Sequence, residues 1–309
     1  FTITSVMPDP EPGSEVAAIV QGTWEAPDWR VSGDDLFVAR NPDGSPKRSG
    51  TRAIPFTLTL PDAALAGPVP AIFYMHGNPG SAEREVPHSG RLFAQAGFAV
   101  IGFTDLANRE YIKGGSVAVF ANVVFLSVLQ NKRVPEAVNL IDTMDQLSFI
   151  RLVKGLARTL DVLPRDAPDG LPDLDADAPL GFEGISHGSF TGVGLLPYAP
   201  EIHAATLVVG GSRYVSTIVH QESDGQSPQH LFETVTAVFP SLTRTEFWVG
   251  IALLQAGFDA QEHVLHARYL YREKHPLETT DRASVLQIEG LGDSFVPVYS
   301  TRAAAAAMR

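Results

Sequence analysis

The pentapeptide GISHG at residues 184–188 has the form G-x-S-x-G and places Ser186 between two glycines. In this pattern the serine sits on a sharp turn between a strand and a helix, and the glycines remove Cβ atoms that would collide there. The flanking segments PLGFE and SFTGVGLLPYA are typical of a buried strand and a helix. The pattern predicts that Ser186 is a nucleophile exposed at a helix N-terminus, where negative charge is favoured. The alternative is a turn in which Ser186 only caps the helix.

The glycine-rich loop HGNPG at 76–80 follows the apolar run AIFYM. Attack of a serine on an acyl group creates an oxyanion, which two fixed backbone N–H groups can stabilise. We expect His187, the residue after the nucleophile, to supply one N–H group. We expect Asn78 to supply the other, because Pro79 has none. An ordinary Asn-Pro-Gly turn at the end of a strand is the alternative.

Asp293 lies in the segment GLGDSFVP (290–297), directly after the apolar run SVLQIE. A carboxylate in a turn after a late strand can orient a catalytic histidine, and the chain order of serine before aspartate agrees with this role. The alternative is a carboxylate that only accepts backbone hydrogen bonds in its own turn.

No histidine follows the predicted acid. All nine histidines lie at or before His275, while the order serine, acid, histidine requires one after Asp293. The last segment, VYSTRAAAAAMR, is typical of a helix and not of a further strand. We therefore expect the histidine beyond Arg309, in a continuation of the natural protein or in a second polypeptide that supplies the final strand. The alternative is a histidine out of the usual order, drawn from His220, His230, His263, His266 and His275.

Short apolar runs alternate with helical patterns along the chain. The runs cover 51–61, 69–75, 98–103, 179–185, 205–210 and 284–290, and those after the first are typical of fully buried parallel strands. One helix ends near Gly97, and another begins at Pro135 with apolar residues at 137, 140, 141, 144, 147, 150 and 153. This alternation predicts an α/β fold with an open, mostly parallel sheet flanked by helices, whose ligands gather at the carboxyl ends of the strands.

Two long connections, 104–178 and 211–283, divide the predicted fold into parts. We expect an N-terminal β extension at 1–50, a core at 51–210 and 284–309, and a helical cap at 211–283 over Ser186. The apolar run at 117–129 and the aromatic-rich stretch at 231–271 suggest an apolar acyl pocket or lid. For 211–283 the alternative is a set of extra helices on the rim of the sheet.

Composition excludes several classes of partner. The 309 residues include 35 acidic and 23 basic side chains, with a net charge of −12 and no dense basic run, which argues against nucleic acid and anionic membranes. The absence of cysteine excludes disulfides, thiolate chemistry and cysteine-bound zinc. The longest apolar run, 117–129, is shorter than the about 20 residues of a transmembrane helix. We expect a mature secreted or periplasmic protein, with a cytoplasmic one as the alternative.

No metal or cofactor is predicted. Asp173, Asp175 and Asp177 resemble the start of a calcium loop, but the glycine and the distal glutamate of that motif are missing, which favours a solvated acidic loop at 166–179. His263 and His266 are three residues apart on a predicted helix, without a third zinc ligand nearby.

The order of HGNPG, GISHGS and GLGDSFVP resembles the α/β-hydrolase fold, in particular its serine esterase and lipase branch, from about residue 51 to the end of the chain. Within it, the sequence is most similar to large bacterial hydrolases with an N-terminal β extension, including lipase-like virulence factors. It departs from the usual pattern at Ser189, where a second glycine is common and where a serine would tighten the pocket behind the nucleophile.

The resemblance implies a cofactor-free hydrolase of small-molecule or lipid-like carboxylic esters, polyesters among them. Such an enzyme would form an acyl-enzyme on Ser186 with the help of Asn78, His187, Asp293 and a histidine. Fold alone does not choose the substrate, so a peptidase or amidase of the same fold is one alternative. A non-catalytic scaffold that lacks its histidine base is the other.

Overall fold

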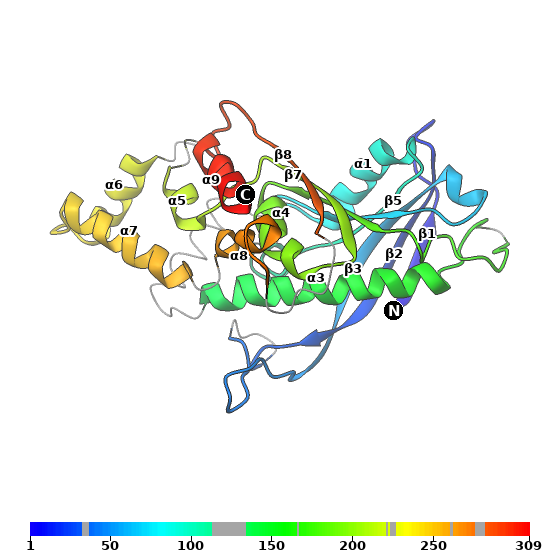
Figure 1. Ribbon diagram of the computed structural model, residues 1–309, viewed down its shortest axis with the longest axis horizontal. Coiled ribbons are helices and arrows are strands. Elements are labelled where there is room, and N and C mark those ends of the chain that lie inside the picture. The colour runs from blue at the N-terminus through cyan, green and yellow to red at the C-terminus, as the bar shows by residue number, and fades with distance from the viewer. Residues whose placement is uncertain are drawn as a thin grey trace.

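The computed structural model describes residues 1–32, 37–112, 134–165, 167–220, 222, 227–259, 262–275 and 282–309. These residues form an eight-stranded sheet in the order β1-β2-β3-β5-β4-β6-β7-β8 (Figure 1). In this order the first three pairs, from β1 to β5, are antiparallel. The last four pairs, from β5 through β4, β6 and β7 to β8, are parallel. The strands are β1 (Thr2–Met7), β2 (Val16–Asp28), β3 (Gly50–Pro61), β4 (Ala71–Met75), β5 (Ala99–Phe103), β6 (Leu180–Ile185), β7 (Ile202–Val208) and β8 (Ser284–Ile288).

The predicted open, mostly parallel sheet is confirmed, and β1 and β2 continue the same sheet as the later strands. β4 and β5 are buried along their whole length, as the sequence predicts for central strands. The prediction of full burial is wrong for the other parallel strands. β6 alternates buried and half-buried positions, β7 mixes buried, half-buried and exposed positions, and β8 has only half-buried and exposed ones. Among the described residues β8 pairs only with β7, and it leaves Leu286 60% exposed.

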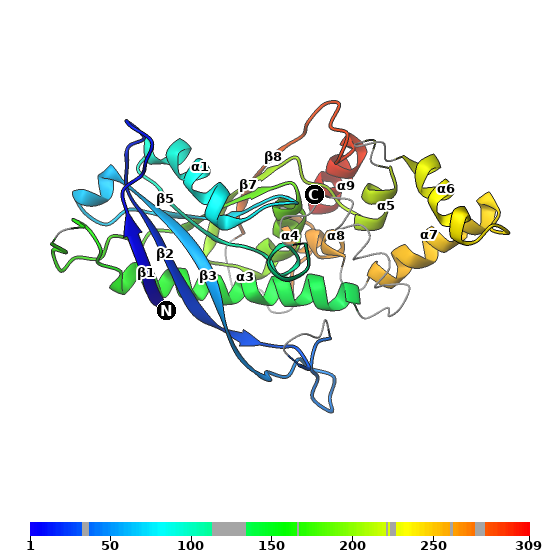
Figure 2. The same cartoon turned by 180° about the vertical axis from the view of Figure 1, so that it is seen from behind.

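Helices cover both faces of the sheet (Figures 1 and 2). On one face, α1 packs against Ile72, Tyr74 and Val100. On the other face α3, α4, α8 and α9 enclose the larger core. The elements are η1 (Asp62–Leu65), α1 (Ala82–Ala94), η2 (Ala107–Ile112), α3 (Val134–Thr159), α4 (His187–Leu195), η3 (Leu196–Tyr198), α5 (Tyr214–His220), α6 (Pro228–Val238), α7 (Arg244–Phe258), α8 (His263–Tyr271) and α9 (Val298–Met308).

Phe149 fixes α3 to the sheet. Its ring centroid lies 4.8 Å from that of Phe103, 4.9 Å from Trp24 and 5.0 Å from Phe73, and all four side chains are buried. Such ring pairs contribute about 0.5–1.5 kcal/mol each beyond the burial of their area. The cluster therefore holds the long helix at a defined position across strands β2, β5 and β4.

The buried face of α3 differs from the predicted one. Ile141, Ile150 and Val153 are buried as expected, but Asp142, Asp145 and Gln146 share the same face and are buried too. Residues 144 and 147, which the apolar pattern places inside, are only half-buried. The apolar pattern gives a rotated face because it assumes that aspartate and glutamine point to solvent.

The segment 211–283 contributes to a second apolar cluster at the carboxyl ends of the strands. Tyr214, Val215 and Val219 of α5 and Phe258 of α7 pack there with Ala107, Phe190 and Val296. Helices α6 and α7, yellow in Figure 1, extend outward from the sheet. The assignment of 211–283 as a cap stays a prediction, and the apolar run at 117–129 lies outside the described residues. None of the described helices combines the length and the apolar character needed to cross a membrane.

Candidate active site

Ser186 forms the turn between β6 and α4. Its φ of 51° and ψ of −112° lie in a region that costs a non-glycine residue about 1–3 kcal/mol. Its N–H donates to the Val208 carbonyl oxygen at 2.8 Å, which ties the turn to the end of β7. The side chain of Ser186 makes no capping bond to α4. Ser186 therefore occupies the N-cap position without a side-chain capping bond, and its role as a nucleophile stays a prediction.

The two glycines of GISHG are required by close backbone contacts. A Cβ atom on Gly184 would lie 2.4 Å from the Gly188 carbonyl oxygen, and one on Gly188 would lie 2.1 Å from the Met75 carbonyl oxygen. Both distances are below any real Cβ contact. The second clash shows that the turn is pressed against the end of β4, which leads into the loop 76–80.

Ser189 occupies the space between the ends of β6 and β7. It is fully buried, and its Oγ lies 2.6 Å from the Gly184 carbonyl oxygen and 3.0 Å from that of Val208. A Cβ atom on Gly210 would come within 1.9 Å of the Ser189 Cβ. Serine in place of a second glycine at position 189 thus fills the space behind the turn with a hydrogen-bonded side chain.

The loop 76–80 lies against Ser186. The Gly188 N–H donates to the His76 carbonyl oxygen at 3.0 Å, and a Cβ atom on Gly77 would lie 3.2 Å from the Ser186 Cβ. Within the described part of the chain, the Asn78 N–H donates no hydrogen bond. An unbonded N–H group next to the serine turn is what an oxyanion site requires. The role of Asn78 as a donor stays a prediction.

A buried polar network supports this loop from behind. His76, Asp105 and Asn108 are 0%, 1% and 4% exposed. His76 Nδ1 lies 2.7 Å from the Gly77 carbonyl oxygen, and its Nε2 lies 3.2 Å from Asp105 Oδ2. Burial acts to raise the pKa of Asp105, but His76, His187 and the Asn108 hydrogen bonds together hold it below its usual value. Asp105 is therefore a buried carboxylate that faces both the loop and the serine turn.

His187, the other predicted oxyanion donor, begins α4 and is 5% exposed. Its Nδ1 lies 2.8 Å from the hydroxyl of Tyr214, which comes from α5. Burial lowers the pKa of the His187 imidazole, although the carboxylate of Asp105 opposes this. The side chain of His187 is thus held by Tyr214 of α5, while its backbone N–H remains the predicted donor.

Asp293 accepts two backbone hydrogen bonds in its own turn. Its Oδ1 lies 2.8 Å from the Phe295 N and 3.0 Å from the Val296 N. Among the described residues no group hydrogen-bonds to its Oδ2. The capping alternative is therefore observed for one oxygen, and the role of Asp293 in orienting a histidine stays a prediction. Gly290 lies between this turn and the end of β7, since a Cβ there would lie 3.2 Å from both Asp293 Cβ and Val209 Cγ1.

None of the nine histidines, all of which lie in described segments, hydrogen-bonds to Ser186 or Asp293. The His220 ring packs 5.8 Å from that of Tyr299 on α9, and its Nδ1 lies 2.8 Å from the Ser216 carbonyl oxygen. His230 is exposed on α6, His263 is buried without a hydrogen bond, His266 contacts Tyr198, and His275 packs on Tyr198 and Tyr269. The identity of the base stays open.

The described residues contain no group of three or more histidine, aspartate or glutamate side chains that could hold a metal ion. In the acidic loop the carboxylates bind backbone instead, with Asp173 Oδ2 accepting from the Val162 N and Asp175 Oδ1 accepting from the Asp177 N, both at 2.8 Å. The His266 Nδ1 lies 2.6 Å from the Tyr198 hydroxyl, while neither nitrogen of His263 has a hydrogen-bond partner among the described residues.

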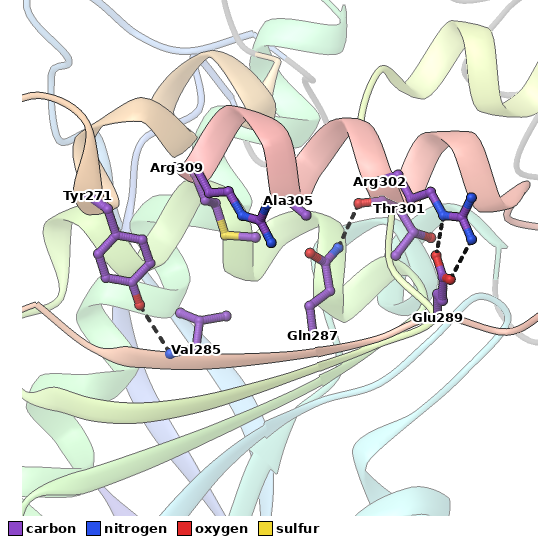
Figure 3. Close-up of a pocket in the computed structure, with 9 residues that line it drawn as sticks. Tyr271, Val285, Gln287, Glu289, Thr301, Arg302, Ala305 and Arg309 are labelled. Atoms are coloured by element: carbon purple, nitrogen blue, oxygen red, sulfur yellow. Dashed lines mark hydrogen bonds and ion pairs between the residues drawn. The ribbon is translucent and has the colours of Figure 1, made fainter.

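A pocket of about 310 Å³ lies between β8 and α9, and none of the predicted site residues lines it. Figure 3 shows the side chain of Gln287 directed from β8 toward α9, where its Nε2 donates to the Thr301 carbonyl oxygen at 2.9 Å. Glu289 and Arg302 form an ion pair at one end of the pocket, 2.8 Å apart. The remaining lining includes the hydroxyl groups of Tyr271 and Thr301 and a second cation, Arg309.

Sequence reasoning missed Asp105, Asn108 and Tyr214. A signal for the first two was present, because TDLAN directly follows the predicted strand at 98–103, and parallel strands carry functional groups at their carboxyl ends. Tyr214 carried no signal, since it joins the site only through the packing of α5 on α4.

Comparison with solved structures supports this architecture. Acetyl xylan esterase 1 from Thermoanaerobacterium sp. aligns with a TM-score of 0.52 at 13% identity, over 99% of this chain and 78% of that one. The acylaminoacyl peptidase of Pyrococcus horikoshii aligns with a TM-score of 0.51 at 13% identity, over 94% of this chain, which spans only 35% of the peptidase. The chain therefore has the α/β-hydrolase fold.

No protein-family model matches the sequence. No curated protein matches it either. The similar structures are esterases and peptidases, and they do not support the narrower resemblance to lipase-like virulence factors or the expected second polypeptide.

Proposed function

We propose that the protein is a serine hydrolase that cleaves carboxylic esters through an acyl-enzyme on Ser186. The observation that carries the proposal is the strained Ser186, whose hydroxyl takes no part in helix capping and which lies against Gly77 of the loop 76–80. Backbone strain persists where the surrounding structure enforces it, and such residues cluster at active sites. The esterase among the similar structures is consistent with this chemistry.

The proposed reaction begins with attack of Ser186 Oγ on the acyl carbonyl. The N–H groups of Asn78 and His187 stabilise the oxyanion, and collapse of the tetrahedral intermediate releases the alcohol and leaves the acyl group on the serine. Water then attacks the acyl-enzyme and releases the acid. A histidine oriented by Asp293 Oδ2 takes the proton from the serine and delivers it to the leaving group.

The apolar cluster around Phe190, Tyr214 and Val296 favours an acyl group with apolar character. These residues come from α4, α5 and the turn after Asp293, so they converge near the carboxyl ends of β6 and β8. Cleavage of an acyl-amino bond is the second hypothesis, because a peptidase with an acylaminoacyl substrate in its name has a similar fold.

The proposal is tested with a fluorophosphonate probe and with p-nitrophenyl esters of increasing acyl length, using p-nitroanilides as the amide series. We expect wild-type protein to be labelled and to hydrolyse esters faster than anilides. Ser186→Ala should remove the label and reduce turnover by several orders of magnitude, about 10⁶-fold in comparable triads. Folded wild-type protein that neither reacts nor hydrolyses would favour the non-catalytic scaffold. Faster cleavage of anilides would favour the peptidase.

A further inference from the structure

The side chain of Asn108 joins both sides of the loop 76–80. Its Nδ2 donates to Asn78 Oδ1 in a short hydrogen bond, and its Oδ1 accepts from the Gly80 N–H at 3.2 Å. Asn108 lies near the start of η2 and is 4% exposed, so water does not compete for these contacts. One buried amide therefore restrains the loop on each side of Pro79.

Asp105 in turn restrains Asn108. Its Oδ1 accepts from the Asn108 N–H at 3.0 Å, and its Oδ2 accepts from Asn108 Nδ2 at 2.6 Å. The Asp105 N–H donates to His76 Nε2 at 3.2 Å, and His76 begins the loop. The loop, the amide and the carboxylate thus form a closed hydrogen-bonded ring beneath the backbone of Asn78.

We propose that Asn108, held by Asp105, is a positioning residue that fixes the Asn78 N–H group for the oxyanion. The inference rests on the proposed function. It follows because donors in an oxyanion site act only when they are fixed before the reaction, and small displacements of such groups reduce rates strongly. The side chain of Asn78 is engaged with Asn108, so the orientation of its backbone N–H depends on that contact.

The test uses Asn108→Ala, Asn78→Ala and the double variant. Asn78→Ala keeps the backbone N–H and removes only the side chain that Asn108 holds. We expect each single variant to lower kcat by about 10- to 100-fold, less than the loss of a whole oxyanion donor, with KM changed by less than about twofold. Because the two residues act through one contact, the double variant should be no slower than Asn108→Ala by more than about twofold.

Asn139→Ala is the matched control. Asn139 is also a buried asparagine, but it lies on α3 and no hydrogen bond joins it to the loop among the described residues. The Asn139→Ala variant should be less stable than wild-type protein but should have an unchanged kcat. A second readout does not need activity: hydrogen exchange of peptides covering 76–80 should quicken in Asn108→Ala and stay unchanged in Asn139→Ala.

The outcomes separate this inference from the proposed function. Wild-type protein that hydrolyses no ester refutes the function, while exchange still reports on the loop. Unchanged exchange at 76–80 in Asn108→Ala overturns the positioning role. Faster exchange with unchanged kcat, or losses that simply add in the double variant, also overturns it.

Discussion

Ser186 after β6 and Asp293 after β8 differ in how much their side chains contribute to the local structure. Ser186 is held in a strained conformation without capping its helix, whereas Asp293 uses one oxygen to close its own turn. A side chain that contributes nothing to local structure is the better candidate for chemistry. For Asp293 the two roles must be separated by experiment.

Asp293→Asn makes that separation. The amide oxygen of asparagine can still accept from the Phe295 and Val296 N–H groups, so the turn and the stability should be retained. The other oxygen becomes an NH₂ group, which cannot accept from an imidazole. We expect ester turnover to fall by about 10⁴-fold, as in a triad whose aspartate is replaced by asparagine. Thermal unfolding and p-nitrophenyl ester kinetics measure the two effects. Retained turnover would leave Asp293 with its turn-closing role alone.

The sequence predicted the serine turn, the loop 76–80 and the acid turn because each has a local glycine or proline pattern. It did not predict Asp105 or Asn108, since their role depends on β5 lying beside β4 in the sheet, which brings η2 under the loop. The position of TDLAN after a predicted strand indicates that these residues lie at the functional edge of the sheet, but no local pattern indicates which loop they contact.

At the scale of elements, apolar runs predicted strands more reliably than they predicted helix faces. β4 and β5 lie inside the predicted runs, because a buried parallel strand needs apolar residues on both faces. α3 buries Asp142 and Asp145 instead, and Asp145 is held by ion pairs with Arg52 and Arg109. Buried charges with partners are the exception that an apolar pattern cannot anticipate.

Two helical glycines should respond oppositely to alanine. A Cβ atom at Gly155 of α3 would meet nothing within 4 Å, so Gly155→Ala should stabilise the protein by about 0.5–1 kcal/mol through helix propensity. At Gly192 of α4, a Cβ atom would lie 2.6 Å from the Phe182 ring and 2.9 Å from Leu207 Cδ2. Gly192→Ala should cost about 1–3 kcal/mol through overpacking. Urea unfolding gives the free energy of unfolding of each variant. If both variants were more stable than wild type, or both less stable, the packing of α4 on the sheet would be contradicted.

At the scale of the whole molecule, the free energy of unfolding depends on pH because burial shifts the pKa values of aspartates and of a histidine in opposite directions. Burial raises the pKa of Asp145 and of Asp173 to about 6, so their contribution to stability is lost as the pH rises through that value. Burial lowers the pKa of His263 to about 3, with smaller contributions from His187 and His266. The net pH dependence of unfolding is the sum of these terms, and one residue is isolated only by comparing variants.

His263→Leu isolates the histidine. The His263 imidazole is 3% exposed, both of its nitrogens lack a hydrogen bond in the described structure, and it packs on Gly194 of α4. Its folded pKa lies below the unfolded value of 6.5, so its stabilising contribution is complete above pH 6.5 and is lost as the pH falls toward 3.

Between about pH 7.5 and pH 5, wild-type protein should lose about 2 kcal/mol of unfolding free energy that His263→Leu does not lose. Urea unfolding at both pH values gives this difference, whatever leucine does to stability at neutral pH. His230→Leu is the control, because His230 is exposed on α6 and should leave the pH dependence unchanged. Equal pH dependence in wild type and His263→Leu would mean that the imidazole reaches solvent or a partner, and that α8 does not seal it against α4.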